Sequence, residues 1–328
     1  MRTGQDPVRF FARISCLRYD TIIRLTDSDG MQQRSSMHKY ERKTKEDRPV
    51  MAICYDFDKT LSPDNMQAQG YLQAIDYEDQ ERFWAESNAL AAERDMDPTL
   101  AWMFLMLRKA RGKEIFRKDM LESYGARVKL YPGVREWFSR VRGYGDAEGV
   151  IVEHYILSSG LREMIEGTEV AGEFEKIYAS SFCYDEDGVA VWPAQVVNYT
   201  GKTQFLFRIS KGVLDVNDDS VNDSFAPEDI RIPFRNMVYI GDSETDIPCM
   251  KLVNSYGGYS VGVYDPDTGS KDRVLRMLAE NRIRYFEAAD YTEGSGLDRL
   301  IKLIIARTAA SERLEEVHCR SMRESICK

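Results

Sequence analysis

The chain has 328 residues, of which 43% are hydrophobic and 30% charged, so disorder along the whole chain is excluded. Its 45 basic and 54 acidic side chains give a formal net charge of −9, which argues against nucleic acid as a partner because phosphate backbones bind basic surfaces. No segment approaches the roughly 18 consecutive apolar residues of a membrane span, so channels, pumps and a membrane partner are excluded.

Cysteine usage limits the metal and redox chemistry. The six cysteines lie far apart with no CxxC spacing, and only three histidines accompany them. This pattern predicts neither a zinc site nor a disulfide framework. We therefore expect a protein of the reducing cytoplasm, and the composition leaves its oligomeric state open.

The first fifty residues differ in charge from the rest of the chain. They carry 11 basic and 7 acidic side chains, a net charge of +4, which leaves −9 − 4 = −13 for the remainder. The stretch 27–48 is polar and almost free of aliphatic side chains. We therefore predict that residues 1–49 form a basic, disordered N-terminal extension and that the folded protein begins at residue 50.

Beyond the extension, short apolar runs alternate with stretches of helical pattern. Such alternation predicts an α/β fold, with a parallel sheet covered by helices on both faces. The predicted strands are 51–55, 150–157, 176–179, 237–240, 260–263 and 284–286.

A long stretch between the first two predicted strands is helical in pattern throughout. Asp97 and Pro98 form an N-cap and a first-turn proline, and Gly112 ends the helix that follows. The stretch is large enough to be a second, smaller domain inserted into the first. Further along, Asp187 and Gly188 lie between two apolar runs and predict a β-hairpin.

The first candidate site follows the first strand, where the sequence is Asp56-Phe57-Asp58-Lys59-Thr60. Side chains alternate along extended chain, so Asp56 and Asp58 point the same way from the carboxyl end of the strand. Two nearby carboxylates repel each other unless a cation lies between them or one binds a proton. The alternative is a pair of solvated turn residues.

Two further motifs suit an anion. The second strand leads into Ser158-Ser159-Gly160, where a hydroxyl and free amides suit phosphate oxygens, although Ser158 could simply be an N-cap. Lys202 stands in the first turn of a predicted helix, where its charge opposes the helix dipole, whereas Lys211 stands in the last turn. The unfavourable position favours Lys202 as the functional lysine, with Lys211 as the alternative.

The fourth motif, Gly241-Asp242-Ser243-Glu244-Thr245-Asp246, follows another strand. Asp242 and Asp246 share one face if a helix begins there. Carboxylate oxygens at the mouth of a sheet suit Mg²⁺. An acidic start of a helix is the alternative.

In this order, the four motifs resemble the haloacid dehalogenase-like hydrolase superfamily, and the order of insertion, SxG motif, hairpin and lysine is similar to the phosphoserine phosphatases. Receiver domains differ, because their acidic pair precedes all other motifs. The resemblance implies a Rossmann-like core and an inserted helical cap of the C1 type. The implied boundaries are 50–64 and 128–308 for the core, 65–127 for the cap and 309–328 for a C-terminal tail.

The resemblance also implies roles for the motif residues. Asp56 is the expected nucleophile on phosphorus, and Asp58 the general acid and base. Ser158, Ser159, Gly160 and Lys202 are expected to hold the phosphoryl group. The implied Mg²⁺ ligands are Asp56, the backbone carbonyl of Asp58, Asp242 and Asp246, the last through a bound water or by supporting Lys202.

An acid at Asp58 favours phosphate esters, because a halide leaving group needs no proton. We therefore predict a Mg²⁺-dependent phosphatase acting on a small phosphorylated metabolite. A phosphomutase of the same fold and a non-catalytic phospholigand-binding protein are the alternatives. The segment 62–67 lacks the glutamate expected for binding the ammonium group of phosphoserine, so the substrate stays open.

Overall fold

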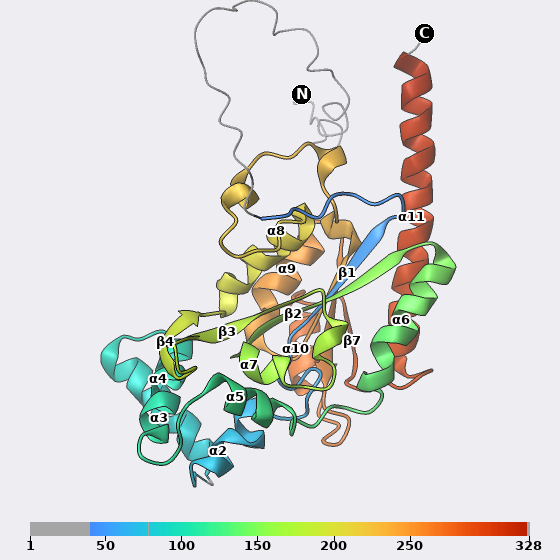
Figure 1. The fold of residues 1–328 in the computed structure, drawn as a ribbon. Helices are drawn as coiled ribbons and strands as arrows, with labels where there is room; N and C mark the ends of the chain where they lie inside the picture. The colour runs from blue at the N-terminus through green and yellow to red at the C-terminus, as the bar shows by residue number, and fades with distance from the viewer. Residues whose placement is uncertain (1–39, 78, 327–328) are drawn as a thin grey trace, which may run out of the picture. The chain divides into compact units, whose positions relative to one another are not determined.

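The computed structural model describes residues 40–77 and 79–326, and its fold is drawn in Figure 1. Residues 1–39, which make up most of the predicted extension, lie outside the described residues. None of the described helices is long and apolar enough to cross a membrane.

A seven-stranded sheet forms the centre of the fold, with strand order β4-β3-β2-β1-β5-β6-β7. All neighbouring strands pair in parallel except β3 and β4, which form the antiparallel hairpin predicted at Asp187 and Gly188. The predicted α/β class is therefore confirmed. The strands are β1 Val50–Tyr55, β2 Ile151–Leu161, β3 Lys176–Tyr184, β4 Ala190–Gln195, β5 Met237–Gly241, β6 Tyr259–Tyr264 and β7 Tyr285–Ala288.

Helices cover both faces of the sheet, because alternate side chains of each buried strand need apolar cover on opposite sides. Met51, Ile53 and Tyr55 of β1 pack with residues of α6 and α11 on one face, whereas Ala52 and Cys54 pack with residues of α8, α9 and α10 on the other. These helices are α6 Val134–Glu148, α8 Thr203–Lys211, α9 Ile247–Ser255, α10 Asp272–Ala279 and α11 Gly296–Ile326; the short α7 spans Arg162–Glu166.

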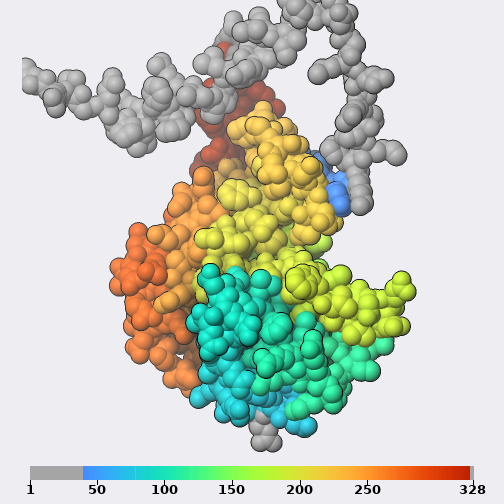
Figure 2. All heavy atoms as spheres, turned by 90° about the vertical axis from the view of Figure 1, so that its left-hand side faces the viewer, coloured from blue at the N-terminus to red at the C-terminus, as the bar shows by residue number. Residues whose placement is uncertain are grey.

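A group of helices lies between β1 and β2 in the chain and gathers at the end of the sheet where the hairpin projects (Figures 1 and 2). Asp97 caps α4 as predicted, because its carboxylate accepts hydrogen bonds from the amides of Thr99 and Leu100. The amide of Lys118 donates to the carbonyl of Gly188, which ties this group to the hairpin. The elements are η1 Met66–Gln69, α2 Tyr71–Ala74, α3 Gln80–Arg94, α4 Pro98–Ala110 and α5 Lys118–Gly125.

The prediction that residues up to 49 form a disordered arm is wrong for residues 40–49. The amide of Lys43 donates to the carbonyl of Gly212 at 2.9 Å, and its ammonium group lies 3.0 Å from the carboxylate of Glu153. Glu46 forms an ion pair with the buried Arg231. The segment is polar because its charged side chains pair with charges of the core.

Over its described residues, the predicted C-terminal tail at residues 309–328 is helical and continuous with a helix that packs on the sheet. The helix α11 continues from Gly296 to Ile326 without a break. Neither proline nor glycine occurs after Gly296 in this helix, so no residue of the sequence interrupts it.

Candidate active site

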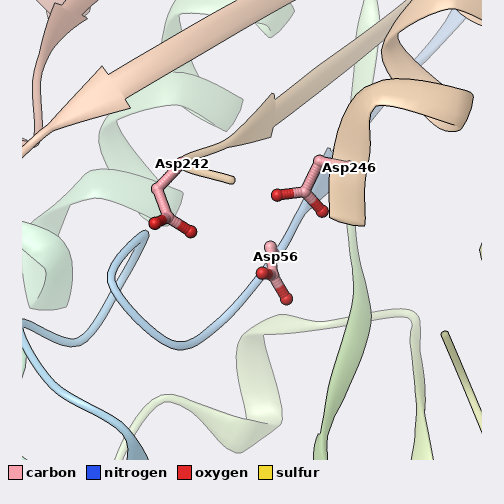
Figure 3. Close-up of side chains that lie close together, drawn as sticks. All are labelled: Asp56, Asp242 and Asp246. Atoms are coloured by element: carbon pink, nitrogen blue, oxygen red, sulfur yellow. The ribbon is translucent and has the colours of Figure 1, made fainter. Parts of the chain in front are cut away.

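Three carboxylates converge at the carboxyl edge of the sheet. Asp56 follows β1 and Asp242 follows β5, and these strands are direct neighbours in parallel register. Asp246 comes from η7 (Glu244–Asp246), one turn beyond Asp242. One oxygen from each of the three side chains lies within 4.8 Å of the others, and Figure 3 shows the three side chains close together.

Lys202 is the lysine of this cluster. Its side chain is completely buried at the end of η3 (Tyr199–Lys202), with Nζ 2.7 Å from Asp246 Oδ1 and 3.2 Å from Asp56 Oδ1. The ammonium group of Lys211 instead donates to backbone carbonyls in the loop after α8, at residues 221 and 223. Of the two candidate lysines, only Lys202 is in contact with the carboxylates.

Asp246 is held in place by its neighbours. Its Oδ1 accepts hydrogen bonds from Lys202 and from the Tyr239 hydroxyl, and its Oδ2 accepts from the amide of Ser243. A Cβ at Gly241 would lie 2.5 Å from Asp246 Oδ2, so this close approach requires glycine. Tyr239 was not predicted as a site residue, because an aromatic residue inside an apolar strand has the pattern of a core residue.

Asp58 takes a different place from the other three aspartates. Its Oδ1 accepts a hydrogen bond from the amide of Met66, the first residue of η1, at 2.9 Å. Its carboxylate lies outside the cluster of three, which leaves its backbone carbonyl for the metal contact that the resemblance implies. A Cβ at Gly160 would lie 3.2 Å from Asp58 Oδ2, so Asp58 is next to the Ser-Ser-Gly motif.

The Ser158-Ser159-Gly160 motif lies at the end of β2, where the register with β3 is interrupted. Ser158 is buried, and its Oγ accepts a hydrogen bond from the amide of Gly160. The amide of Leu161 donates to the sulfur of Met66, so neither of these amides is free in this structure. Within the described chain, the buried Ser159 Oγ has no hydrogen-bond partner.

The aspartates carry more negative charge than the buried lysine balances. Burial raises the pKa of Asp56 to about 6, although Lys202 opposes the shift, and burial with repulsion from Asp246 raises that of Asp242 to about 8. Burial and the charge of Asp56 also raise the pKa of Asp58 well above its usual range. For Lys202, burial acts downward, but Asp246 and Asp56 raise its pKa.

This donor set fits a divalent cation. Buried carboxylates with raised pKa values are stabilised by a cation between them, and hard oxygen ligands suit Mg²⁺. Asp242 faces one further cation, Arg273 of α10, whose Nη1 lies 3.1 Å from Asp242 Oδ2. Arg273 could not be predicted as a site residue, because an arginine in an amphipathic helix has the pattern of a solvated residue.

The comparison with known families agrees with this site. A family model described as haloacid dehalogenase-like hydrolase matches residues 53–251, more than half of the chain. The match includes all four motifs. The chain therefore belongs to the haloacid dehalogenase-like hydrolases, which confirms the predicted superfamily and the predicted enzyme class.

Individual relatives are distant. An uncharacterized protein of Borreliella burgdorferi is 24% identical over 273 residues, which cover 76% of this chain and 94% of the relative. A haloacid dehalogenase family hydrolase from Salmonella enterica serovar Typhi has a similar structure, with a TM-score of 0.51 and 16% identity over 78% of this chain and 72% of that one. A probable phosphoserine phosphatase from Vibrio cholerae gives a TM-score of 0.50 with 13% identity, over 81% and 67% of the two chains. These structures share the fold.

Proposed function

We propose that this protein is a Mg²⁺-dependent phosphatase that hydrolyses a small phosphomonoester through an aspartyl-phosphate on Asp56. The proposal rests on one observation above the others: Asp56, Asp242 and Asp246 converge, the buried Lys202 contacts two of them, Asp56 and Asp246, and the carboxylate of Asp58 lies outside this cluster, bonded to the amide of Met66. This separation suits two different tasks for the two aspartates of the first motif.

Asp56 is the nucleophile of the first step. Its carboxylate oxygen forms a bond to phosphorus, and the bond from phosphorus to the ester oxygen breaks. Asp58 donates its proton to that leaving oxygen, so that a neutral alcohol departs. The raised pKa of Asp58 favours its protonated form and therefore suits a proton donor.

The second step reverses the role of Asp58. Its carboxylate, now ionised, takes a proton from a water molecule that attacks phosphorus. The bond between phosphorus and the Asp56 oxygen breaks, inorganic phosphate leaves, and the Asp56 carboxylate is regenerated. Two displacements thus replace one difficult attack of water on a phosphate ester.

The remaining residues bind and orient. Lys202 contacts the Asp56 carboxylate at 3.2 Å and is placed to hold a phosphoryl oxygen beside it, while Asp246 fixes the position of Lys202. Ser158 and Ser159 are the hydroxyl donors that β2 offers, and the hydroxyl of Ser159 has no partner among the residues that the structure describes. When bound to Asp56 and Asp242, Mg²⁺ would offset the negative charge of the phosphoryl group and favour the ionised form of Asp56.

The size of the substrate is limited by the cap side of the site. A Cβ at Gly160 would lie 2.3 Å from the terminal methyl of Met66, so the first turn of the cap lies directly on the phosphate-binding motif. This closeness supports a small phosphomonoester. The similarity to a probable phosphoserine phosphatase concerns the fold and does not identify the substrate. The segment after Asp58 lacks the glutamate expected for binding the ammonium group of phosphoserine, so the substrate must be identified by experiment.

The test is a phosphate-release assay on a panel of phosphorylated metabolites, with Mg²⁺ or with EDTA, for the wild type and for Asp56→Asn. We expect turnover of at least one small phosphomonoester that requires Mg²⁺ and is lost in Asp56→Asn. Conversion of a sugar phosphate to its isomer without phosphate release would instead indicate a phosphomutase. Full activity of Asp56→Asn, or activity in EDTA, would contradict the proposal.

A further inference from the structure

The C-terminal helix α11 has two unlike halves. Its first half packs on the sheet, where Ile301, Ile304 and Ile305 are buried. Glu312 forms an ion pair with Arg235 at 3.0 Å, but every residue from 313 to 325 is exposed except for the half-buried Met322. Figure 1 shows the last turns of α11 extending beyond the strands of the sheet.

An apolar stripe runs along the outer side of this helix. Leu303, Leu314 and Val317 are 69%, 71% and 52% exposed, and the exposed Ala310 and Ser321 continue their line. Successive positions are seven, four, three and four residues apart, which fits the spacing of a coiled-coil seam. The buried isoleucines lie on the opposite side of the helix, so the stripe faces away from the sheet.

Two opposite charges occupy the same seam at equal distances from its centre. Arg307 and Glu324 are both exposed and both lie at seam positions; the guanidinium of Arg307 also lies 5.7 Å from the ring centroid of Tyr259 in its own chain. The midpoint between Leu314 and Val317 is also the midpoint between Arg307 and Glu324. The stripe therefore has the symmetry of a surface that pairs with itself in the antiparallel direction.

We infer that this stripe is the contact surface for a second copy of the chain, packed as an antiparallel pair of α11 helices. In this pair Leu314 meets the partner's Val317, Ala310 meets the partner's Ser321, and Arg307 meets the partner's Glu324, each contact occurring twice about a twofold axis. Parallel pairing would instead place Arg307 against the partner's Arg307. Charge complementarity therefore favours a second copy of this chain as the partner and an antiparallel direction of the two helices.

The contact is small, so the dimer is concentration-dependent. The seam from Leu303 to Glu324 is about 30 Å long at 1.5 Å per residue, and one helix pair buries less surface than a standard protein interface. The surface lies on a helix remote in sequence from the four motifs, so loss of the dimer leaves the active site intact. The inference therefore does not depend on the proposed phosphatase activity.

The first experiment measures molar mass by sedimentation equilibrium over concentrations on the order of 1–100 µM. We expect the wild-type chain to shift from monomer to dimer over this range and Leu314→Glu/Val317→Glu to stay monomeric. Both positions are exposed, so circular dichroism and the melting temperature should not change when the two proteins are compared at concentrations where both are monomeric. A wild type that stays monomeric, or a double variant that still dimerises, overturns the inference.

The second experiment tests the direction of pairing by charge exchange. Arg307→Glu alone and Glu324→Arg alone place like charges opposite each other and should each weaken the dimer about tenfold, whereas the double exchange Arg307→Glu/Glu324→Arg should restore it. Arg323→Glu makes the same charge change on the opposite side of the helix and serves as the matched control, with no loss of dimer expected. Failure of the double exchange to restore dimerisation overturns the antiparallel arrangement.

Discussion

The two ends of the central sheet each hold a buried group of charged side chains, and the groups differ in balance. At the amino end, Arg231 donates two hydrogen bonds of 2.7 Å to Glu153, with Lys43 and Glu46 beside them. Burial opposes ionisation of Glu153, but its hydrogen bonds, chiefly from Arg231, lower its pKa to about 2. Every buried charge there has a partner of opposite sign.

At the carboxyl end, burial raises the pKa values of Asp56 to about 6 and Asp242 to about 8, and among the described residues Lys202 is the one buried cation in contact with the aspartates. The same sheet thus contains a balanced group that fixes the chain and an unbalanced group that lacks positive charge. Burial alone does not identify a functional site. A buried group that lacks opposite charge does indicate such a site, because a bound cation or a proton must supply the missing positive charge.

Removal of one carboxylate from the unbalanced group should have the largest effect. Asp56→Asn removes the nucleophile and should lower phosphate release at least ~10³-fold. It also removes a buried charge, so the melting temperature without metal should stay the same or rise. Phosphate-release kinetics check the loss of activity, and differential scanning calorimetry checks the melting temperature. A large loss of stability with activity preserved would show that Asp56 has a structural role and not a catalytic one.

The lysine of the unbalanced group should matter for both properties. Lys202→Met removes the partner of the buried Asp246, so we expect a loss of about 3–5 kcal/mol in unfolding free energy and a loss of activity of at least ~100-fold. Adding Asp246→Asn should recover stability without activity. Lys211→Met is the matched control, since its ammonium group contacts loop carbonyls and the ring of Phe225 and, within the described chain, none of the site aspartates, and it should keep its activity.

The balanced group should respond in the opposite way. Glu153→Gln leaves the buried Arg231 without its bidentate carboxylate and should cost about 3–5 kcal/mol of unfolding free energy in urea titrations. Turnover per folded molecule should stay at the wild-type level, because Glu153 lies at the far end of β2 from Ser158. Selective loss of turnover in this variant would show that the amino end takes part in function.

Metal addition should distinguish the two groups directly. At a Mg²⁺ concentration 100 times the dissociation constant, we expect a stabilisation of about 2.7 kcal/mol, seen as a higher melting temperature that EDTA removes. Asp242→Asn should abolish most of this shift, whereas Glu153→Gln should keep it. An equal shift in all three proteins would place the metal elsewhere.

The smallest effect concerns His154, which follows Glu153 in β2 and bonds through Nδ1 to the Tyr55 hydroxyl. Burial lowers the pKa of this imidazole to about 3, so the folded protein binds its proton less readily than the unfolded chain does. This contribution is complete above pH ~6.5 and is lost as the pH falls toward 3. Between pH 7 and 5 we expect the wild type to lose about 2 kcal/mol more unfolding free energy than His154→Gln.

The sequence predicted the carboxyl end of the sheet well, because its signals are local. Asp56 and Asp242 each follow an apolar strand directly, and parallel strands carry such residues to one edge. The choice of Lys202 over Lys211 also followed from its position in a helix. The expectation that Asp56 and Asp58 point the same way does not bring Asp58 into the cluster: β1 ends at Tyr55, before either residue, and the carboxylate of Asp58 lies outside the group of three.

The amino end was missed because its contacts join distant parts of the chain. Glu46 and Arg231 are 185 residues apart, and neither has a pattern that differs from a solvated charge. Residues 40–49 were therefore predicted as part of a disordered arm. The helix beyond residue 309 was missed for a related reason. Almost all of its side chains from residue 313 onward are exposed, so the sequence there lacks the periodic apolar pattern of a helix that packs on a core.

The most direct test of the account is whether phosphate becomes attached to Asp56. The wild-type protein is mixed with a turned-over phosphomonoester and Mg²⁺, quenched in acid within one turnover and digested, and the peptides are analysed by mass spectrometry. We expect the mass of one phosphoryl group on the peptide that contains Asp56, absent in Asp56→Asn and present in Glu153→Gln. Turnover with no phosphorylated Asp56 peptide, or phosphorylation at another residue, would contradict the account.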